Sequence, residues 1–408
     1  MTKLNELIQQ FCPDGVEYKT LGSFATISRG GNFQKKDFRD DGFPCIHYGQ
    51  IYTKYGLFVD KTVSFISPAC ASKQKTASKN DIIMAVTSEN IEDVCKCIVW
   101  LGDGEVAVSG HSAIIRHSQN PKYLAYYFHS RMFFDQKRKL AHGTKVIEVT
   151  PDKLASVKIP LPPIGVQREI VRILDNFTEL TAELTAELTA RKKQYEYYRD
   201  KLLAYNYDVE LFTISDIAET SIGLATSVSQ HKRENGVILL HNSDIQQNKI
   251  VLKTVEYISK EFAQKNKKKV LRKGDIITVH TGDVGTSAVI DDEYDGAIGF
   301  TTITTRIKDT ARVNPYFLCH YLNSHKCKQD IASMTISDRS NLNQKSFNTI
   351  QIPVPPLEIQ NRIVNVLENF DAICSDLKIG LPAEIAARQK QYEFYRDKLL
   401  TFKEQKSK

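Results

Sequence analysis

Apolar residues recur at steps of three, four or seven along one stretch of the chain, from residue 167 to residue 203. They are Ile170, Leu174, Phe177, Leu180, Leu184, Leu188, Tyr195, Tyr198 and Leu202. This spacing is close to the 3.5-residue period of a coiled coil. The pattern therefore predicts one long helix with an apolar seam, extending roughly 55 Å at about 1.5 Å per residue.

A second long helix is predicted from Gln360 onward. Its apolar positions are Ile363, Leu367, Phe370, Leu377, Ile385, Tyr392, Tyr395 and Leu399. Gly380-Leu-Pro382 interrupts the pattern, because proline is disfavoured inside a helix and favoured at a helix start. We expect a new helix from Pro382. Matching lengths and matching polar positions favour pairing between the two long helices, and the alternative is that each packs on its own domain.

The rest of the chain alternates short apolar runs with turn residues. Four runs have the character of buried strands, at residues 81–86, 96–100, 275–279 and 301–307. Helices are predicted over 121–134 and 315–325, each with a proline at an early position. Each domain ends in a proline-rich strap, residues 159–163 and 352–356, which favours an extended chain. The predicted fold class is mixed α/β (α+β), in two domains.

The two halves of the chain repeat each other. Residues 158–177 are identical to residues 351–370 at ten of twenty positions, and residues 192–203 match residues 389–400 at ten of twelve. The segments between these repeats keep register at an offset of 194 residues, although most other residues differ. A shared scaffold with divergent surfaces suits two recognition tasks on a partner with two similar sites, and DNA is such a partner.

Composition changes this picture little. The chain has 408 residues, a net charge of +7, 41% hydrophobic residues, a pI near 8.8 and a mean hydropathy of −0.33. A mildly basic net charge of this size indicates nucleic-acid binding only if the basic residues are clustered in the chain. The eight cysteines form no CxxC pair and the ten histidines show no metal-ligand spacing, so we expect reduced thiols, no metal and a cytoplasmic protein. No apolar run reaches the roughly 18 residues of a membrane span, so no membrane contact is expected.

A four-residue unit is repeated inside the first long helix, at 181–184 (TAEL) and 185–188 (TAEL), followed by Thr189-Ala190. Ala, Glu and Leu are strong helix formers, so the unit is either a chance low-complexity patch or an adjustable spacer. Two Pro-Pro straps, each followed by Gln and an Ile-Val-rich helix, and two KQYE(Y/F)YRDKLL helices accompany it. In this combination the chain resembles, over essentially its full length, the specificity subunit of type I restriction-modification enzymes.

The resemblance implies DNA recognition and scaffolding without catalysis. Each variable domain is then a target recognition domain that reads one half of a split, asymmetric sequence in double-stranded DNA. The repeated regions form antiparallel helices that space the domains and bind two copies of the modification subunit, the methyltransferase. A separate restriction subunit supplies the motor and the nuclease. S-adenosylmethionine, ATP and Mg²⁺ are accordingly expected in the partner subunits, and this chain is expected to bind no cofactor.

The resemblance also orders the chain. We predict recognition domain 1 with an N-terminal helix at 1–157, the central repeat with the spacer helix at 158–204, recognition domain 2 at 205–350, the distal repeat with the second spacer helix at 351–402, and a polar tail at 403–408. Candidate contacts with partner subunits lie in the two repeats: Gln167, Ile170, Phe177, Tyr195, Tyr198, Gln360, Ile363, Phe370, Tyr392 and Tyr395.

Basic and polar loops supply the candidates for DNA contact. They are Lys73, Lys75, Lys79, Gln136, Lys137, Arg138, Thr144 and Lys145 in the first domain, and Lys232, Arg233, Lys267, Lys269, Arg339, Asn341 and Asn343 in the second. Lysines mainly neutralise phosphates, whereas Arg, Asn and Gln can read base edges. A lysine run such as 267–269 is equally consistent with a solvated face. Segments 142–145 and 338–343 are better supported, because both follow the predicted helix and precede the strap.

Two short motifs mimic catalytic loops. Residues 314–317 (NPYF) are similar to the loop with which adenine methyltransferases hold a flipped base, but they align with Asn120-Pro121, a helix start. Residues 282–285 (GDVG) are too short for a cofactor loop, and a strand pattern follows them. We therefore expect no catalytic residue. The alternative functions are a stand-alone sequence-specific DNA-binding regulator and a structural coiled-coil adaptor.

Overall fold

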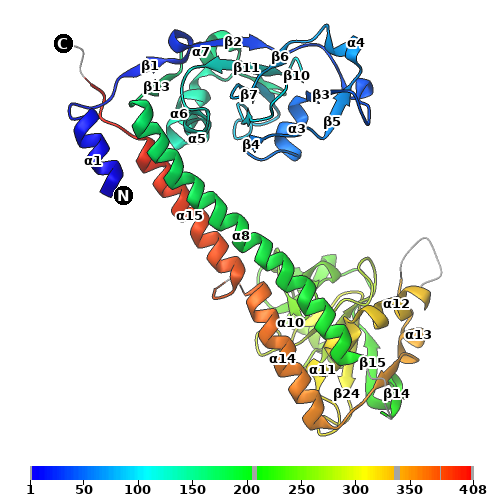
Figure 1. Cartoon of the computed structure of the whole chain (residues 1–408). Coiled ribbons are helices and arrows are strands. Elements are labelled where there is room, and N and C mark those ends of the chain that lie inside the picture. The colour runs from blue at the N-terminus through cyan, green and yellow to red at the C-terminus, as the bar shows by residue number, and fades with distance from the viewer. Residues whose placement is uncertain (1, 205–208, 335–340, 377, 406–408) are drawn as a thin grey trace. The chain divides into compact units, whose positions relative to one another are not determined.

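The computed structural model describes residues 2–204, 209–334, 341–376 and 378–405 (Figure 1). The chain forms two compact units: unit 1 is Met1–Leu184 with Ile385–Lys408, and unit 2 is Thr185–Glu384. Each unit contains one mixed α/β domain, called domain 1 and domain 2 below. The long helix α8 lies between the two domains in the chain, so the predicted fold class is confirmed.

Domain 1 is built on two sheets. The larger has the strand order β2 (Ala25–Arg29), β11 (Ser112–His117), β7 (Ile82–Ala85), β9 (Cys97–Trp100), β4 (Phe58–Val59). The smaller has the order β5 (Ser64–Ile66), β3 (Phe43–Ile46), β10 (Val106–Val108), β6 (Thr76–Ala77). Every side chain of β7 and β9 is buried, which explains their unbroken apolar runs and confirms the two strands predicted there.

Domain 2 repeats most of this topology. Its first sheet, which corresponds to the large sheet of domain 1 without a strand equivalent to β4, has the order β15 (Ala218–Ile222), β24 (Thr302–Ile307), β21 (Ile276–Val279), β22 (Ser287–Val289). The other four-stranded sheet has the order β16 (Lys232–Arg233), β20 (Tyr257–Ile258), β17 (Val237–Leu240), β23 (Ile298–Gly299), and β18 (Ile245–Gln246) pairs with β19 (Lys249–Ile250). In both domains the small sheet has one parallel pair, β3 with β10 and β17 with β23. The strands predicted at 275–279 and 301–307 are confirmed.

In each domain two consecutive helices follow the large sheet: α5 (Pro121–Phe128) with α6 (Arg131–Leu140), and α11 (Pro315–Leu322) with α12 (His325–Met334). The prediction of one helix over 121–134 was wrong. Ser130 starts a new helix, because its Oγ accepts a hydrogen bond from the Phe133 amide at 3.3 Å. Ser324 does the same for Cys327 at 3.3 Å, so the helix predicted over 315–325 ends early.

Short elements complete the two domains. In unit 1 they are α1 (Thr2–Phe11), α2 (Leu21–Phe24), η1 (Lys35–Asp37), α3 (Tyr48–Thr53), α4 (Pro68–Ala71), β8 (Thr87–Ser88), β12 (Ile147–Glu148) and α7 (Pro151–Ala155). In unit 2 they are α9 (Ile214–Ile217), η2 (Ser229–His231), η3 (Asn242–Asp244), α10 (Lys260–Lys265), η4 (Lys267–Lys269) and α13 (Gln344–Asn348).

The proline straps are short strands. In unit 1, β13 (Lys158–Pro160) pairs antiparallel with β1 (Tyr18–Thr20), and Tyr18 is opposite Pro160. In unit 2, β25 (Gln351–Pro353) pairs with β14 (Leu211–Thr213), and Leu211 is opposite Pro353. The extended conformation predicted for the straps is confirmed, and each strap fixes the entry of a long helix to its domain.

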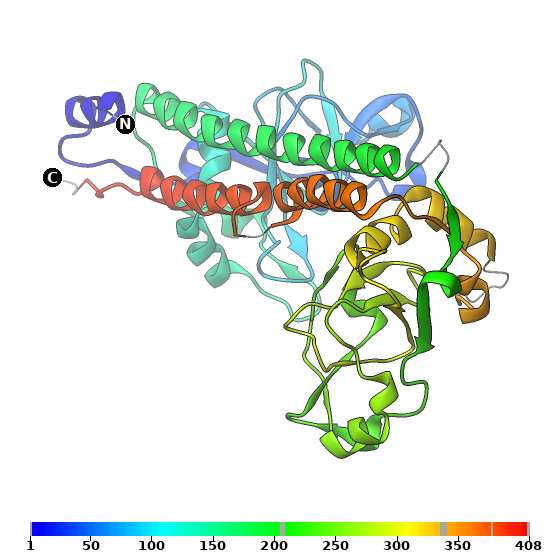
Figure 2. The ribbon, with the colours of Figure 1, turned by 90° about the horizontal axis from the view of Figure 1, so that it is seen from below.

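The long helices are α8 (Ile164–Leu203), α14 (Leu357–Ser375) and α15 (Leu381–Leu400). In unit 1 the first part of α8 lies beside α15, and in unit 2 its last part lies beside α14, as Figures 1 and 2 both show. The break near Gly380 is confirmed, since α15 starts at Leu381. A Cβ at Gly380 would lie 2.6 Å from the Ala372 carbonyl oxygen, so the turn requires glycine.

The end of each repeat docks on the other repeat's domain. In unit 1, Asp397 Oδ1 accepts a hydrogen bond at 3.2 Å from the Arg131 amide, at the start of α6. In unit 2, Asp200 Oδ1 accepts one at 3.1 Å from the His325 amide, at the start of α12. A carboxylate at a helix N-terminus is favourable. The α15 helix therefore belongs structurally to domain 1, and the end of α8 to domain 2.

Candidate nucleic-acid and partner interfaces

A polar cleft of about 690 Å³ opens in domain 1. Its walls come from the end of β2, the following segment 31–34, the start of α3 and the turn 109–111 before β11. Its hydrogen-bonding side chains are those of Arg29, Asn32, Gln34, His47, Tyr48, Ser109 and His111. Amide, imidazole and guanidinium groups match the donors and acceptors on base edges. The cleft can therefore read DNA chemically.

Three rings line one wall of this cleft. The ring centroids of His47 and Tyr48 lie 4.6 Å apart, and those of Tyr48 and His111 lie 4.9 Å apart. Burial lowers the pKa of His47, and nearby Lys35 and His111 lower it further. His47 is therefore neutral at pH 7. Its Nδ1 accepts from the Gly49 amide at 3.2 Å, which places its proton on Nε2.

Two of the predicted lysines lie beside the cleft. Lys73 and Lys75 are exposed and flank Gln74, whose side chain covers Gly31 so closely that a Cβ there would overlap it. Contact of the two ammonium groups with DNA phosphates stays a prediction. Lys79 lies elsewhere on domain 1 and pairs with exposed Asp103 at 2.6 Å.

The predicted segment 142–145 is also brought to the cleft. The strand that follows it, β12, pairs with β8, with Ile147 opposite Ser88. Glu148 forms an ion pair with Arg29, a residue of the cleft wall. Thr144 and Lys145 lie exposed in the loop before β12.

The three predicted DNA-contact residues of α6, Gln136, Lys137 and Arg138, differ in exposure. Arg138 is exposed at the end of α6. Lys137 is buried, and its Nζ donates to the carbonyl oxygens of Glu92 at 2.8 Å and Val94 at 2.6 Å. Gln136 accepts from the Lys158 amide at 2.9 Å. The predicted DNA contacts of Lys137 and Gln136 are not supported by these positions, because both side chains bind backbone groups of other segments of unit 1.

In domain 2 the equivalent segment occupies the equivalent place. Asn341 forms a β-bridge with Thr281, and Thr281 Oγ1 donates to Asn341 Oδ1 at 2.9 Å. Thr281 aligns with Thr87, which pairs with β12 in domain 1. Arg339 lies outside the described residues. Asn343 is exposed, and its Oδ1 caps α13 by accepting from the Lys345 amide at 2.8 Å.

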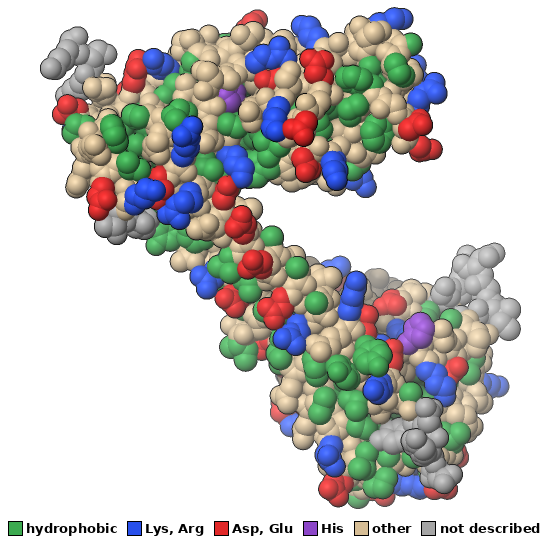
Figure 3. Space-filling view, viewed as in Figure 1, with side chains coloured by type: hydrophobic (Ala, Val, Ile, Leu, Met, Phe, Trp, Pro, Cys, Tyr) green, Lys and Arg blue, Asp and Glu red, His purple; other side chains and the backbone are tan. Residues whose placement is uncertain are grey.

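The other basic candidates of domain 2 are dispersed. Lys232 pairs with Glu256 at 2.7 Å, and Arg233 is exposed beside it. Lys267 is exposed, whereas Lys269 donates to the Gly223 carbonyl at 2.7 Å. On the face drawn in Figure 3, Lys and Arg side chains are mixed with Asp and Glu on both units. Charge alone therefore does not mark the DNA-binding face.

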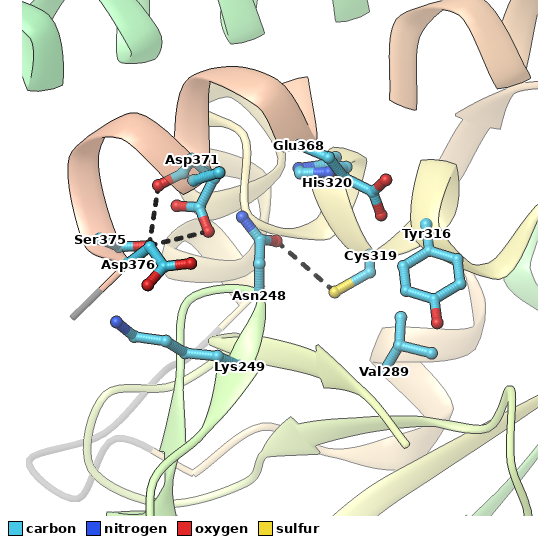
Figure 4. Close-up of a pocket in the computed structure, with 11 residues that line it drawn as sticks. Asn248, Lys249, Val289, Tyr316, Cys319, His320, Glu368, Asp371, Ser375 and Asp376 are labelled. Carbon is cyan, nitrogen blue, oxygen red and sulfur yellow. Dashed lines mark hydrogen bonds between the residues drawn. The ribbon is translucent and has the colours of Figure 1, made fainter. Parts of the chain in front are cut away.

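A cavity of about 350 Å³ in unit 2 lies between the β18–β19 hairpin, α11 and α14 (Figure 4). Asn248 at the hairpin tip accepts from Asn323 Nδ2 at 2.7 Å and donates to the Tyr195 hydroxyl at 2.9 Å. Glu368, Asp371 and Asp376 also line the cavity. Burial and the neighbouring Asp371 raise the pKa of Glu368. Three carboxyl groups disfavour a phosphate, so we do not assign this cavity to DNA.

The residues predicted to contact partner subunits fall into a buried group and a more accessible group. Gln167 and Gln360 are fully buried, and their Oε1 atoms accept from the Asn120 amide at 3.1 Å and the Asn314 amide at 2.8 Å. These bonds lock each strap to its domain. Ile170 and Ile363 are also buried, so a partner contact of these four residues is not supported.

The six aromatic candidates are more accessible on the whole. Tyr195 is buried, and its hydroxyl lies 3.3 Å from His320 Nδ1. Half-buried are Phe177, Phe370, Tyr392 and Tyr395, and Tyr198 is 38% exposed. Their contact with a partner stays a prediction.

Sequence reasoning missed two groups of residues. One is the cleft wall of domain 1, although the alignment of His47 with His241 and of Thr87 with Thr281 was a signal for it. The other is the pair of most exposed aromatic residues of the repeats, Tyr197 and Phe394. Apolar periodicity points to seam residues, and an exposed ring lies off the seam.

The two motifs that mimic catalytic loops have local structural roles. Asn314 is the N-cap of α11, and its Oδ1 accepts from the Tyr316 amide at 2.8 Å. The predicted helix start is thus confirmed. Residues 282–285 precede β22, a strand, as predicted. Among the described residues, no group of three His, Cys, Asp or Glu side chains is arranged to hold a metal ion. None of the described helices is long and apolar enough to cross a membrane.

Comparison with known proteins places this arrangement in one family. The model of the type I restriction modification DNA specificity domain matches twice, at residues 13–191 and 206–387. A putative type I restriction enzyme specificity subunit of Haemophilus influenzae is 31% identical over 73% of this chain and 77% of its own length. The EcoR124I/EcoR124II specificity subunit of Escherichia coli is 34% identical over 60% of this chain and 63% of its own length.

Solved structures share the fold. A chain from a study of complex assembly and conformational transition of a type I R-M system aligns over 96% of this chain and 98% of its own length, with a TM-score of 0.67 and 20% identity. The S subunit from M. genitalium aligns over 95% of this chain and 96% of its own, with a TM-score of 0.52 and 16% identity. At these identities the likeness concerns the fold.

Proposed function

Because the chain belongs to the type I restriction-modification DNA specificity family, we propose that it recognises a split DNA sequence and scaffolds a modification and restriction complex. Domain 1 reads one half of an asymmetric target in double-stranded DNA, and domain 2 reads the other. Two copies of a modification subunit bind the repeated helices, and a restriction subunit joins through the assembled complex.

One observation carries this proposal: equivalent wall positions hold different chemistry in the two domains. Tyr48 and His111 in domain 1 correspond to Asn242 and Thr301 in domain 2. The first pair presents two packed rings, whereas Asn242 Nδ2 donates to Thr301 Oγ1 at 3.3 Å in the second. Two copies of one frame with different hydrogen-bonding groups suit the reading of two different half-sites.

The chemistry belongs to the partners under this proposal. Methyl transfer and DNA cleavage occur in the modification and restriction subunits, which also bind S-adenosylmethionine, ATP and Mg²⁺. The chain acts in the cytoplasm, where the DNA and these cofactors are. Purified chain given S-adenosylmethionine is expected to leave DNA unmethylated, and any methylation by contaminant-free chain contradicts this assignment.

Mapping of methylated adenines tests the recognition function. The chain is expressed with its modification subunit in cells that lack other adenine methylation. The expected result is methylation of one bipartite motif, with two unlike half-sites at a fixed gap. A contiguous motif, or no new methylation beside an active partner, contradicts the proposal. Sequence-specific DNA binding without any partner contact would favour a stand-alone regulator instead.

A further inference from the structure

One surface feature is built twice, once in each unit. Tyr197 near the end of α8 and Phe394 in α15 occupy the same position of the repeat, and each is 61% exposed. The Tyr197 ring meets its neighbour Tyr198 at 5.4 Å and 75°. The Phe394 ring meets Tyr395 at 5.4 Å and 76°. Each ring therefore stands edge-on to the next aromatic and points away from its own unit.

A lysine lies over each ring. Lys201 Nζ is 5.8 Å from the Tyr197 centroid, and Lys398 Nζ is 5.8 Å from the Phe394 centroid. Both lysines are exposed. The repeated unit is thus an aromatic knob with one positive charge beside it. The two repeats differ here only by a hydroxyl, so the ring itself is the shared property.

Exposed apolar side chains are common on proteins, but this pair differs from the others. Val366 and Ile373 of α14 are 42% and 46% exposed, and their counterparts Ile173 and Leu180 in α8 are half-buried. Among the equivalent positions of α8 and of α14 with α15 for which both members are described, only Tyr197 and Phe394 are large apolar residues exposed in both helices. The exposure of one side of each helix does not by itself explain why both repeats carry a large aromatic ring at this position.

We infer that Tyr197 and Phe394 are equivalent anchors for two copies of one protein partner, and this inference rests on the proposed function, in which that partner is the modification subunit. Two equivalent knobs suit two copies of one complementary pocket, apolar at its base and carrying a carboxylate for the lysine. A few residues carry most of the binding energy at protein interfaces, and tyrosine is enriched among them.

The anchors also assign each copy to a domain. Tyr197 follows domain 1 in the chain but lies in unit 2, where the end of α8 docks on α12. Phe394 lies in unit 1, where α15 docks on α6. The copy held by Tyr197 therefore sits at domain 2, and the copy held by Phe394 sits at domain 1. Each half-site receives its partner from the repeat that is remote in sequence.

Native mass spectrometry of the full chain with its modification subunit tests the anchors. Wild type is expected to carry two copies. Tyr197→Ala and Phe394→Ala are each expected to carry one, with affinity at the altered site reduced about 30-fold, and the double variant none. Tyr197→Phe and Phe394→Tyr are the matched controls, and both keep two copies because each creates the ring of the other repeat.

The outcomes separate the two proposals. Two copies on Tyr197→Ala at wild-type affinity would overturn the anchors and leave the proposed function intact. A wild-type chain that binds no modification subunit would overturn the proposed function. Cross-linking of the Tyr197→Ala complex tests the assignment: the remaining copy is expected to cross-link to lysines in 385–405, and cross-links confined to 185–204 would contradict it.

Discussion

Phe177 stacks on Tyr395 in unit 1, with ring centroids 5.4 Å apart and planes inclined by 22°. Phe370 stacks on Tyr198 in unit 2, at 5.9 Å and 29°. Each pair joins the start of one repeat to the end of the other, because Phe177 aligns with Phe370 and Tyr198 with Tyr395. The repeats are therefore exchanged between units, and each α/β domain depends on a helix from the far part of the chain.

Phe177→Ala should destabilise unit 1 by about 1–2 kcal/mol, since a half-buried ring loses about half of a core phenylalanine's contribution. The single tryptophan, Trp100, is buried in unit 1, so its fluorescence during urea unfolding reports this unit. Phe370→Ala is the matched control in unit 2. It should leave the fluorescence midpoint unchanged while lowering the stability seen by circular dichroism. Equal midpoint shifts for both variants would contradict separate stacks.

Gln167→Leu should lower the free energy of unfolding of unit 1 by about 2–3 kcal/mol. The substitution keeps most of the volume but leaves the Asn120 amide and the Pro162 carbonyl, now bound at 3.1 and 2.8 Å, without their partner. Trp100 fluorescence again measures the loss. The exposed neighbour Arg168→Ala is the control and should cost little. If Gln167→Leu lowers the free energy of unfolding by less than Arg168→Ala does, the two hydrogen bonds of Gln167 contribute nothing to stability.

His320 should make unit 2 sensitive to acid. Burial, with a smaller effect from Arg199, lowers its pKa to about 4. Between pH 6.5 and 4 the unfolded chain binds a proton at this residue that the folded chain does not, so stability falls as pH falls through this window. The loss at pH 5 is about 2 kcal/mol relative to pH 7. Calorimetry at both pH values should show a smaller acid loss for His320→Gln. Parallel losses in the two proteins would exclude His320 as the source.

The two recognition faces should respond separately to substitution. Asn341→Ala should relax base preference in one half-site only, by about 1–3 kcal/mol for a lost base contact. Arg138→Gln with Lys145→Gln should alter the other half-site or weaken binding generally, with a shallower salt dependence. Methylome maps and binding at several salt concentrations distinguish these results. An equal change in both half-sites from either variant would contradict the assignment of one domain to each.

Insertion of one Thr-Ala-Glu-Leu unit after Leu188 should lengthen the gap of the recognised sequence. The division between the units falls at residues 184 and 185, inside these repeats. Four helical residues add roughly 6 Å, close to two base pairs of about 3.4 Å. One base pair is the expected change, because only one of two paired helices is lengthened. The half-sites should not change, and methylome mapping shows both quantities. An unchanged gap in an active complex would exclude this segment as the spacer.

Much of the architecture was readable from local patterns. The 3.5-residue spacing of α8, the apolar run of β7, the largely apolar run of β21 and the prolines of the straps each act over a few neighbouring residues, and the elements that they indicate were predicted correctly. Local signals failed at Ser130, where one hydroxyl on the N-cap divides a predicted helix in two. A short break in an otherwise apolar pattern does not show where one helix ends and the next begins. The hydrogen bonds of the N-cap residue are needed to locate that boundary.

The sequence alone determined the family, the duplication and the two mixed α/β domains, because these depend on repeated motifs and periodicity. Only the tertiary structure decided which side chains face outward. It showed that Gln167, Gln360 and Lys137, which were candidate contacts with partners or DNA, are buried. Their side chains bind backbone groups that are distant in sequence. It also brought Arg29, His47 and His111 to one cleft, and exposed Tyr197 and Phe394. Such choices depend on packing between segments far apart in the chain, which periodicity does not encode.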